Sequence, residues 1–304
     1  MSAPLYATGL SRPTAPPLPW WLRTLSRLPL SLLYAVATTA TWVMRRVVRH
    51  RVETVRTNIE RSFPQLPVRE QRRIEARYYA NLSQVLAEVL KMGGLRREEL
   101  QQRMRFSNPQ LLRDLVASGS SALVVCAHQC NWEWLLLALS AQLEVPVQAA
   151  YKPLRGQLGE RLMRALRSRF GAELVPAKEL LMSLLRRRDA RAIAMVADQA
   201  PVSSDFKHWT RFLEQPTAFY MGPEKIAQAT RFAVIFVAMR RLSRGHYEVV
   251  CELLAPPGER TAAGEITERY ARAVERQVRA APADWMWSHR RWKLAPPAEG
   301  AGKD

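Results

Sequence analysis

The fold class is decided by one stretch of the sequence, Ala122-Leu123-Val124-Val125-Cys126-Ala127-His128-Gln129-Cys130-Asn131-Trp132-Glu133. Its first six residues form a short apolar run that indicates a buried strand, and a second apolar run, Leu135–Leu139, indicates the core face of a helix. His128 and Glu133 therefore lie where a strand becomes a helix. In an open α/β sheet, this edge is the usual place for a functional site.

The spacing of His128 and Glu133 allows a pair in only one geometry. On one continuous helix, residues five apart point about 140° away from each other. We therefore expect His128 in the turn before the helix and Glu133 in its first turns, with Asn131 as the N-cap. The carboxylate would then orient an imidazole that takes a proton from a hydroxyl, beside helix N–H groups that suit an oxyanion. The alternative is a strand-end histidine followed by a solvated glutamate.

Strand and helix patterns alternate along the rest of the chain after residue 108. This alternation predicts an α/β fold with a mixed, largely parallel sheet covered by helices on both faces. We expect strands at 122–127, 145–151, 173–176, 192–197, 233–239 and 246–254, and helices at 108–117, 132–142, 159–170, 178–188, 218–230 and 264–280.

The N-terminal region differs from this pattern. Residues 1–19 are rich in proline, and 28–44 form a 17-residue run without charge between Arg27 and Arg45. Seventeen residues is the lower limit for a membrane span. We expect a flexible lead (1–19), a membrane anchor with a basic continuation (20–60) and one large domain (61–304); a buried or interfacial helix is the alternative to a span.

The composition indicates a globular chain whose positive charge serves either solubility, with a coding bias towards arginine, or an anionic partner. It is 48% hydrophobic and carries a net charge of +19. Nucleic acid, anionic lipid, an acidic carrier protein and a phosphorylated sugar all fit that charge. Three cysteines are too few for a disulfide framework. Cys126, His128 and Cys130 have a spacing that suits a metal or a Cys–His pair, but the turn expected after His128 argues against both, so we expect no metal.

Two other strand ends carry polar residues. Lys152 follows the strand at 145–151 and would hold a phosphate or an oxyanion near His128, if the two strands are neighbours. Asp198 and Gln199 follow the strand at 192–197 and point into the same crevice. The alternatives are a solvated lysine and an Asx-turn aspartate.

The C-terminal segment 285–293 interleaves tryptophans with basic residues. Such a segment suits a lipid interface or stacking with nucleic acid. It contains His289, a rival to His128 as general base, followed by Arg290 and Arg291. The alternative is a segment docked on the core with its charges in water.

Taken together over residues 20–293, these motifs resemble the bacterial lipid A late acyltransferases, within the wider His-x4-Asp/Glu acyltransferase superfamily. The features that carry the resemblance are the N-terminal anchor, Arg56, Asn58-Ile59, Phe63-Pro64, His128, Asn131-Trp132-Glu133, Tyr151-Lys152-Pro153, Arg169-Phe170-Gly171-Ala172, Asp198-Gln199 and Trp287-Ser288-His289-Arg290-Arg291-Trp292-Lys293.

The resemblance implies a glycerolipid-acyltransferase-like fold and acyl transfer from acyl-carrier protein or acyl-CoA to a hydroxyl of a lipid A precursor. It implies His128 as general base and Glu133 as its orienting acid. Asn131, Lys152 and Arg169 would bind substrate, together with Asp198, Gln199, His289, Arg290 and Arg291. It implies no cofactor, an anionic glycolipid acceptor, no nucleic-acid partner, and a catalytic domain on the cytoplasmic face of the inner membrane.

The chain departs from the family's pattern at three places. Cys130 stands where the family usually has Gly, Ala200-Pro201 replaces a Gly-containing turn, and residues 212–218 are a degenerate form of a Phe-Phe-Gly-x-Pro-Ala segment. A lysophospholipid or other lipid O/N-acyltransferase is therefore an alternative within the superfamily. A basic membrane- or nucleic-acid-binding protein without catalysis is the alternative of another class.

Overall fold

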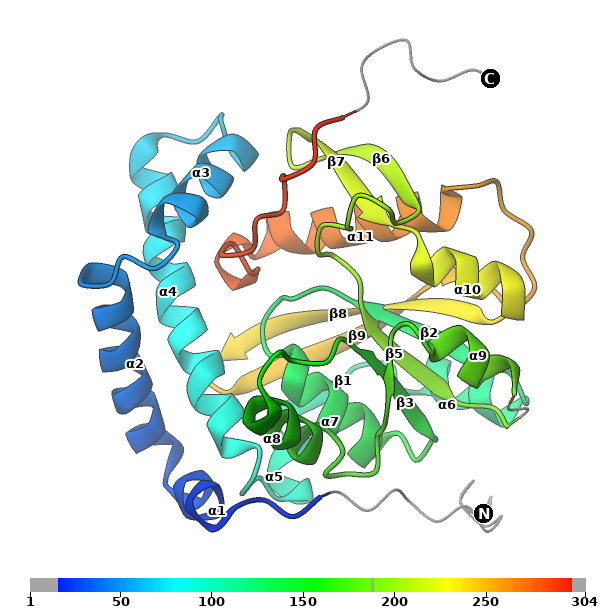
Figure 1. Ribbon diagram of the computed structural model, residues 1–304, viewed down its shortest axis with the longest axis horizontal. Coiled ribbons are helices and arrows are strands. Elements are labelled where there is room, and N and C mark those ends of the chain that lie inside the picture. Colours follow the sequence, from blue (N-terminus) through cyan, green and yellow to red (C-terminus); the bar gives the residue numbers. More distant parts are fainter. Residues whose placement is uncertain (1–15, 187–188, 297–304) are drawn as a thin grey trace.

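A seven-stranded sheet forms the centre of the computed structural model, which describes residues 16–186 and 189–296 (Figure 1). Strands β8 and β9 pair antiparallel, and every other neighbouring pair in this sheet is parallel. The prediction of a mixed, largely parallel sheet is confirmed. The spatial order is β1 (Met104–Phe106), β9 (His246–Ala255), β8 (Ala233–Ser243), β2 (Ala122–Cys126), β5 (Ala192–Val196), β3 (Val147–Tyr151) and β4 (Glu173–Pro176).

Helices cover both faces of this sheet, as the alternation predicts (Figure 1). Successive side chains of a strand point to opposite faces, so Val124 belongs to one hydrophobic core and Leu123 and Val125 to the other. The core that contains Val124 is covered by α5 (Arg97–Arg103), α6 (Gln110–Ala117), α7 (Trp132–Gln142) and α8 (Gln157–Arg167). The other core is covered by α9 (Leu180–Leu185), α10 (Gly222–Thr230) and α11 (Glu265–Ala280). Of the helix expected at 178–188, residues 187–188 lie outside the described residues.

The N-terminal region forms four helices along one side of the molecule (Figure 1). They are α1 (Trp20–Arg27), α2 (Leu30–Arg46), α3 (Val52–Ser62) and α4 (Val68–Lys91). The uncharged run 28–44 forms one helix from Leu30 on, and Pro29 separates this helix from α1. α2 buries Leu33, Tyr34 and Ala37 against α4. Within residues 16–186 and 189–296, no helix is both long and apolar enough to cross a membrane. Most of the expected lead, residues 1–15, lies outside the described residues.

A second, two-stranded sheet replaces part of an expected helix. The helix predicted at 218–230 begins only at Gly222, because its first residues belong to the hairpin of β6 (Lys207–Phe212) and β7 (Gln215–Tyr220). Both turn residues, Leu213 and Glu214, have positive φ, as tight hairpins require. Neither is a Gly or Asn, so the sequence carries no recognisable turn signal.

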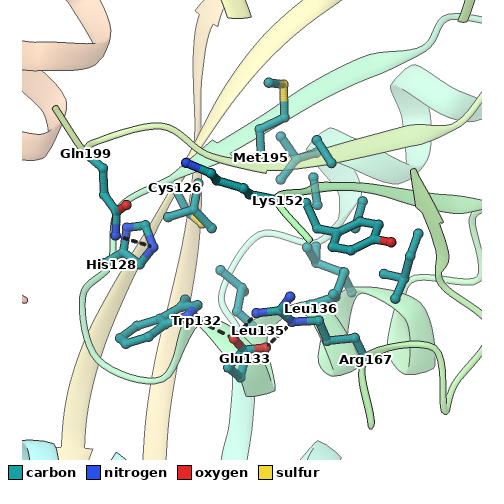
Figure 2. Close-up of a pocket in the computed structure, with 18 of the residues that line it drawn as sticks. Cys126, His128, Trp132, Glu133, Leu135, Leu136, Lys152, Arg167, Met195 and Gln199 are labelled. Carbon is teal, nitrogen blue, oxygen red and sulfur yellow. Dashed lines mark hydrogen bonds and ion pairs between the residues drawn. The ribbon is translucent and has the colours of Figure 1, made fainter. Parts of the chain in front are cut away.

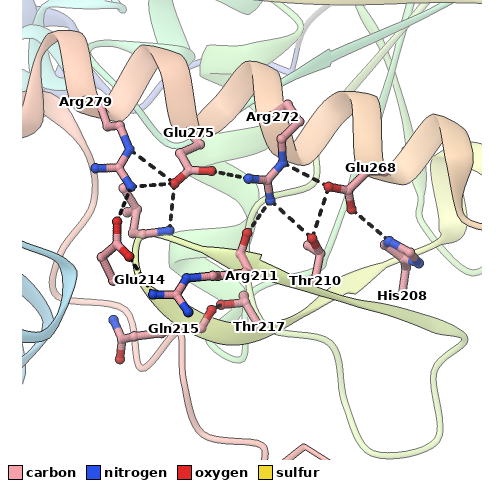
Figure 3. Close-up of polar contacts among 11 residues, drawn as sticks. His208, Thr210, Arg211, Glu214, Gln215, Thr217, Glu268, Arg272, Glu275 and Arg279 are labelled. Carbon is pink, nitrogen blue, oxygen red and sulfur yellow. Dashed lines mark hydrogen bonds and ion pairs between the residues drawn. The ribbon is translucent and has the colours of Figure 1, made fainter.

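Ion pairs fix this hairpin to α11 (Figure 3). Glu268 on α11 accepts hydrogen bonds from His208 and Thr210 on β6, and Arg279 bonds Glu214 at 2.8 Å. The hairpin is therefore held against the last long helix, and its inward-facing Phe212 and Phe219 are fully buried. The chain after α11 continues through a short 3-10 helix, Pro282–Asp284, into the C-terminal segment.

Candidate active site

His128 is held by Asp198, which follows the neighbouring strand. β2 and β5 pair in parallel with Cys126 opposite Val196, so the residues two positions beyond each strand also lie side by side. His128 Nδ1 lies 2.6 Å from Asp198 Oδ1, and the backbone N–H of His128 donates to Oδ2 at 3.0 Å. Trp285 Nε1 also donates to Oδ2, at 2.7 Å. The buried carboxylate is thus fixed from three directions.

Hydrogen bonds favour the carboxylate form of Asp198 and orient the His128 ring. Burial by itself raises the pKa of Asp198, but the charge of His128 and the hydrogen bonds from His128 and Trp285 outweigh it, and the carboxyl pKa is below its ordinary value. The side-chain amide nitrogen of Gln199 lies 3.2 Å from His128 Nε2. An amide nitrogen only donates, so Nε2 accepts and Nδ1–H donates to Asp198. This is the tautomer that a general base requires.

Glu133 does not contact His128, which corrects the geometry expected for the pair. Its carboxylate forms a bidentate ion pair with Arg167 on α8, at 2.8 and 2.6 Å, and accepts a hydrogen bond from Trp132 Nε1 at 3.2 Å (Figure 2). The charge and hydrogen bond of Glu133 raise the pKa of Arg167 against the lowering effect of burial. The physical reason is the strand order, because β5 brings Asp198 directly beside β2.

The predicted N-cap is confirmed. Asn131 Oδ1 accepts the backbone N–H of Trp134 at 2.9 Å, and Asn131 Nδ2 donates to the buried Glu88 at 2.7 Å. A cap of this kind contributes about 1 kcal/mol. The turn before it places Cys130 at φ 54°, a conformation that favours Gly. This explains why the resemblance places a glycine at this position.

A cavity of about 450 Å³ opens beside His128 (Figure 2). It lies between α7 and the face of the sheet that α7 covers. Its polar wall contains His128, Glu133, Lys152, Arg167 and Gln199. Its apolar wall is formed by Val124, Leu135, Leu136, Leu139, Ala149, Leu174 and Ala194. One end of the cavity is therefore suited to chemistry on polar groups and the remainder to a hydrocarbon chain.

The other predicted site residues divide into two groups. Lys152 lines the cavity and is exposed. It does so although β5 lies between β3 and β2, so the condition that these two strands are neighbours is not met. Arg169 instead donates to the backbone carbonyls of Met92 and Leu95. His289 Nε2 accepts the backbone N–H of Ala200 at 3.0 Å. Arg169 and His289 therefore bond backbone atoms of the protein and lie outside the cavity walls.

The C-terminal segment is docked on the core, as the alternative interpretation held. Trp285 and Trp287 are buried and pack against each other at 4.7 Å between ring centroids, so they do not form an exposed aromatic surface. Arg290 is exposed, whereas Arg291 is 2% exposed and lines no part of the cavity. Arg291 was expected to bind substrate, but the structure places its side chain in the interior, away from the cavity.

Sequence reasoning missed three residues of this site, Arg167, Trp132 and Trp285. Arg167 is one of several arginines near the end of α8, and nothing in its spacing distinguishes it from Arg164 or Arg169. Trp132 packs edge-on against the His128 ring at 5.1 Å. Its position inside the strand-to-helix motif was the only available signal.

Comparison with known proteins assigns the family. The sequence profile of the bacterial lipid A biosynthesis acyltransferases matches residues 20–294. The lipid A biosynthesis lauroyltransferase of Escherichia coli (strain K12) is 23% identical over 312 residues, covering 96% of this chain and 96% of that protein. The chain belongs to the bacterial lipid A biosynthesis acyltransferase family and is an acyltransferase.

Proposed function

We propose that this acyltransferase moves a fatty acyl group from a thioester donor, acyl-carrier protein or acyl-CoA, to a hydroxyl of a lipid A precursor or related glycolipid. The observation that carries this proposal is a histidine whose Nδ1 is fixed by the buried Asp198 and whose side chain lines a cavity with a long apolar wall. The site of action is a membrane surface, for which the family resemblance implies the cytoplasmic face of the inner membrane.

In the proposed reaction, His128 acts as general base. The acceptor hydroxyl gives its proton to Nε2 as its oxygen attacks the thioester carbonyl. The tetrahedral intermediate then expels the thiolate, which takes the proton back from the imidazolium. Asp198 stabilises the imidazolium and holds the reactive tautomer. General-base assistance of this type contributes about 10²–10⁴-fold, and no acyl-enzyme is needed because a thioester is already activated.

Arg167 and Lys152 supply the positive charge of the site. Both line the cavity, where they suit the oxyanion of the intermediate or a phosphate of the acceptor. Glu133 accepts two hydrogen bonds from Arg167, so we propose that it positions this arginine. Glu133 therefore acts in the site by orienting Arg167, and it does not orient the His128 imidazole.

The acyl chain of the donor fits the apolar part of the cavity. Parallel register places Val124, Ala194, Ala149 and Leu174 in one row across four strands, and this row lines the cavity. Two of the four are alanines, which leave room between the sheet and α7. Val124 and Ala194 in this row lie two residues before Cys126 and Val196, the last residues of β2 and β5 before the His128–Asp198 pair. The acyl chain would therefore extend from the reacting carbonyl towards the interior of the sheet.

The exposed face of α1 and α2 supports membrane association. Trp20, Val36 and Trp42 are 72%, 58% and 58% exposed, while the opposite side of α2 packs on α4. An amphipathic helix with exposed tryptophans and flanking arginines suits the plane of a membrane interface. We therefore propose that α1 and α2 lie in the interface, in place of the spanning anchor first expected.

A single-turnover assay of His128→Ala tests the proposal. We expect transfer from an acyl-carrier-protein thioester to a lipid A precursor to be abolished while the unfolding transition stays near that of the wild type. His246→Ala is the matched control, since His246 is the first residue of β9 and lies outside the cavity walls, and it should transfer at the normal rate. Near wild-type turnover by purified His128→Ala would disprove the assignment of the base.

A further inference from the structure

Arg291 is a buried cation without a conventional partner. Its side chain is 2% exposed, and within the described part of the chain none of its three guanidinium nitrogens has a hydrogen-bond partner. Its Cζ lies 4.4 Å from the centroid of the Phe219 ring on β7. A buried charge in apolar surroundings is costly, and a single aromatic face compensates only part of that cost. The position therefore calls for a functional explanation.

The segment that carries Arg291 is fastened to the loop of the catalytic carboxylate. Trp285 donates to Asp198, and His289 accepts the backbone N–H of Ala200, two residues beyond Asp198. On the other side, Asn58 Nδ2 donates to the carbonyls of Trp287 and His289 at 2.8 and 3.0 Å. The segment is thus clamped between α3 and the end of β5.

Arg291 is connected to the strand that carries His128 through two aromatic rings: Phe219 packs on Tyr270 at 6.1 Å between ring centroids, and the Tyr270 hydroxyl donates to the carbonyl of Cys126, two residues before His128. Phe219 and Tyr270 belong to the hydrophobic core on the opposite face of the sheet from Val124 and the cavity. Burial lowers the pKa of Arg291 to about 10, while the negative charge of Asp198 acts in the opposite direction. The guanidinium is still charged at neutral pH and interacts with Asp198 through a medium that screens charge poorly.

We propose that Arg291 is a positioning residue of catalysis, whose buried charge adds to the contacts that favour the carboxylate form of Asp198 and lowers the proton affinity of His128. This inference rests on the proposed role of His128 as base. A fixed positive charge favours the carboxylate form of Asp198 and disfavours the imidazolium form of His128. His128 is then neutral, and able to accept a proton, at a lower pH than in the same site without Arg291.

Several other titratable or polar groups surround the His128–Asp198 pair, and substitution of Arg291 leaves them unchanged. On the cavity side they are Gln199, Lys152 and Glu133, and on the protein side they are Trp285, His289, Tyr270, Cys126 and Lys293. Because burial lowers the pKa of His289 to about 4, His289 stays neutral across the range of the assay. A change in the pH profile on substitution of Arg291 therefore reports the His128–Asp198 pair.

The experiment is the pH profile of kcat/KM for the full-length wild type, Arg291→Lys, Arg291→Met and Arg291→Gln. At acidic pH, kcat/KM falls as His128 becomes protonated, and we call this part of the profile the acidic limb. Loss of the cation should move the midpoint of the acidic limb to a higher pH by about one unit. Arg291→Lys should leave that midpoint unchanged. The matched control is Arg191→Met, because Arg191 is also buried but pairs with Asp189 at the other end of β5. Its limb should not move.

Two outcomes would overturn the inference. One is a folded Arg291→Met or Arg291→Gln protein whose acidic limb coincides with that of the wild type. The other is an Arg291→Lys limb displaced as far as that of the neutral variants. If the methionine variant does not fold, the glutamine variant carries the test. Failure of the proposed function is distinguishable, because His128→Ala would then retain transfer.

Discussion

Asp198 and Glu133 have separate tasks, and substitution can tell them apart. Asp198→Asn keeps the shape of the side chain but removes the charge that stabilises imidazolium, so we expect kcat/KM to fall by about 10³–10⁴-fold. Glu133→Gln loses the ion pair to Arg167, and we expect a smaller reduction. Single-turnover rates of both variants measure the difference.

A double-mutant cycle checks this division of roles. If Glu133 acts through Arg167, Glu133→Gln and Arg167→Met together should cost little more than either one alone, since contacting residues are non-additive. Glu133→Gln and Asp198→Asn should cost more together than either does alone. A rate for Glu133→Gln as low as that for Asp198→Asn would show that Glu133 supports the imidazole after all.

His289 gives the fold a predictable pH dependence. Burial depresses its pKa in the folded state to about 4, below the ordinary value of 6.5. The unfolded chain therefore binds a proton at His289 that the folded chain does not, and stability is lost as pH falls from about 6.5 towards 4. We expect His289→Gln to show a smaller drop in unfolding midpoint between pH 7 and pH 5 than the wild type does. Equal drops in the two proteins would contradict this prediction.

The apolar cavity depends on how α7 lies on β2, β5 and β3. Ala149 and Ala194 are register partners on β3 and β5, and both line the cavity together with Leu139 of α7. A larger side chain there would shorten the space for an acyl chain. One methylene in such a pocket changes discrimination by about 1–3 kcal/mol. Ala149→Leu should therefore shift the preferred donor towards shorter chains, measured by competition among thioesters of different length.

The control for this substitution is Ala238→Leu, on β8 and outside the cavity walls. It should leave the chain-length preference unchanged while testing the general cost of a larger residue in the sheet. An Ala149→Leu protein with wild-type preference would show that the acyl chain lies elsewhere.

The charge of the whole molecule acts together with its exposed apolar face. The net charge is +19, but part of the basic flank after α2 is neutralised internally, since the buried Glu75 pairs with Arg45, Arg56 and Arg72. Electrostatic attraction to an anionic surface decays within about 10 Å at 0.1 M salt. Membrane binding should therefore need both the remaining charge and the exposed tryptophans of α1 and α2.

Vesicle sedimentation tests this requirement. Wild-type protein should bind vesicles containing anionic lipid and lose part of that binding as salt rises. Replacement of Trp20 and Trp42 by serine should weaken binding at every salt concentration, because burial of each side chain contributes about 1.5–3 kcal/mol. Leu242 and Leu253, exposed on β8 and β9, provide the matched pair of substitutions. Undiminished binding by the tryptophan variant would rule out the α1–α2 face.

Local chemistry explains what the sequence by itself determined. The apolar run 122–126, the N-cap at Asn131 and the alternation of strands with helices depend on neighbouring residues, and each agrees with the structure. The hairpin at 207–220 was not predictable because its turn, Leu213-Glu214, lacks the residues that normally adopt positive φ.

Only the tertiary structure decided which carboxylate serves His128. Asp198 is 70 residues away in the chain, and its contact depends on β5 lying beside β2, which no local pattern specifies. The same is true of Arg167 on α8 and of Trp285 and Arg291 in the C-terminal segment, because both elements are far from His128 in the chain. Strand order and helix docking fix these distances, whereas the sequence near His128 fixes only its position at the end of a strand.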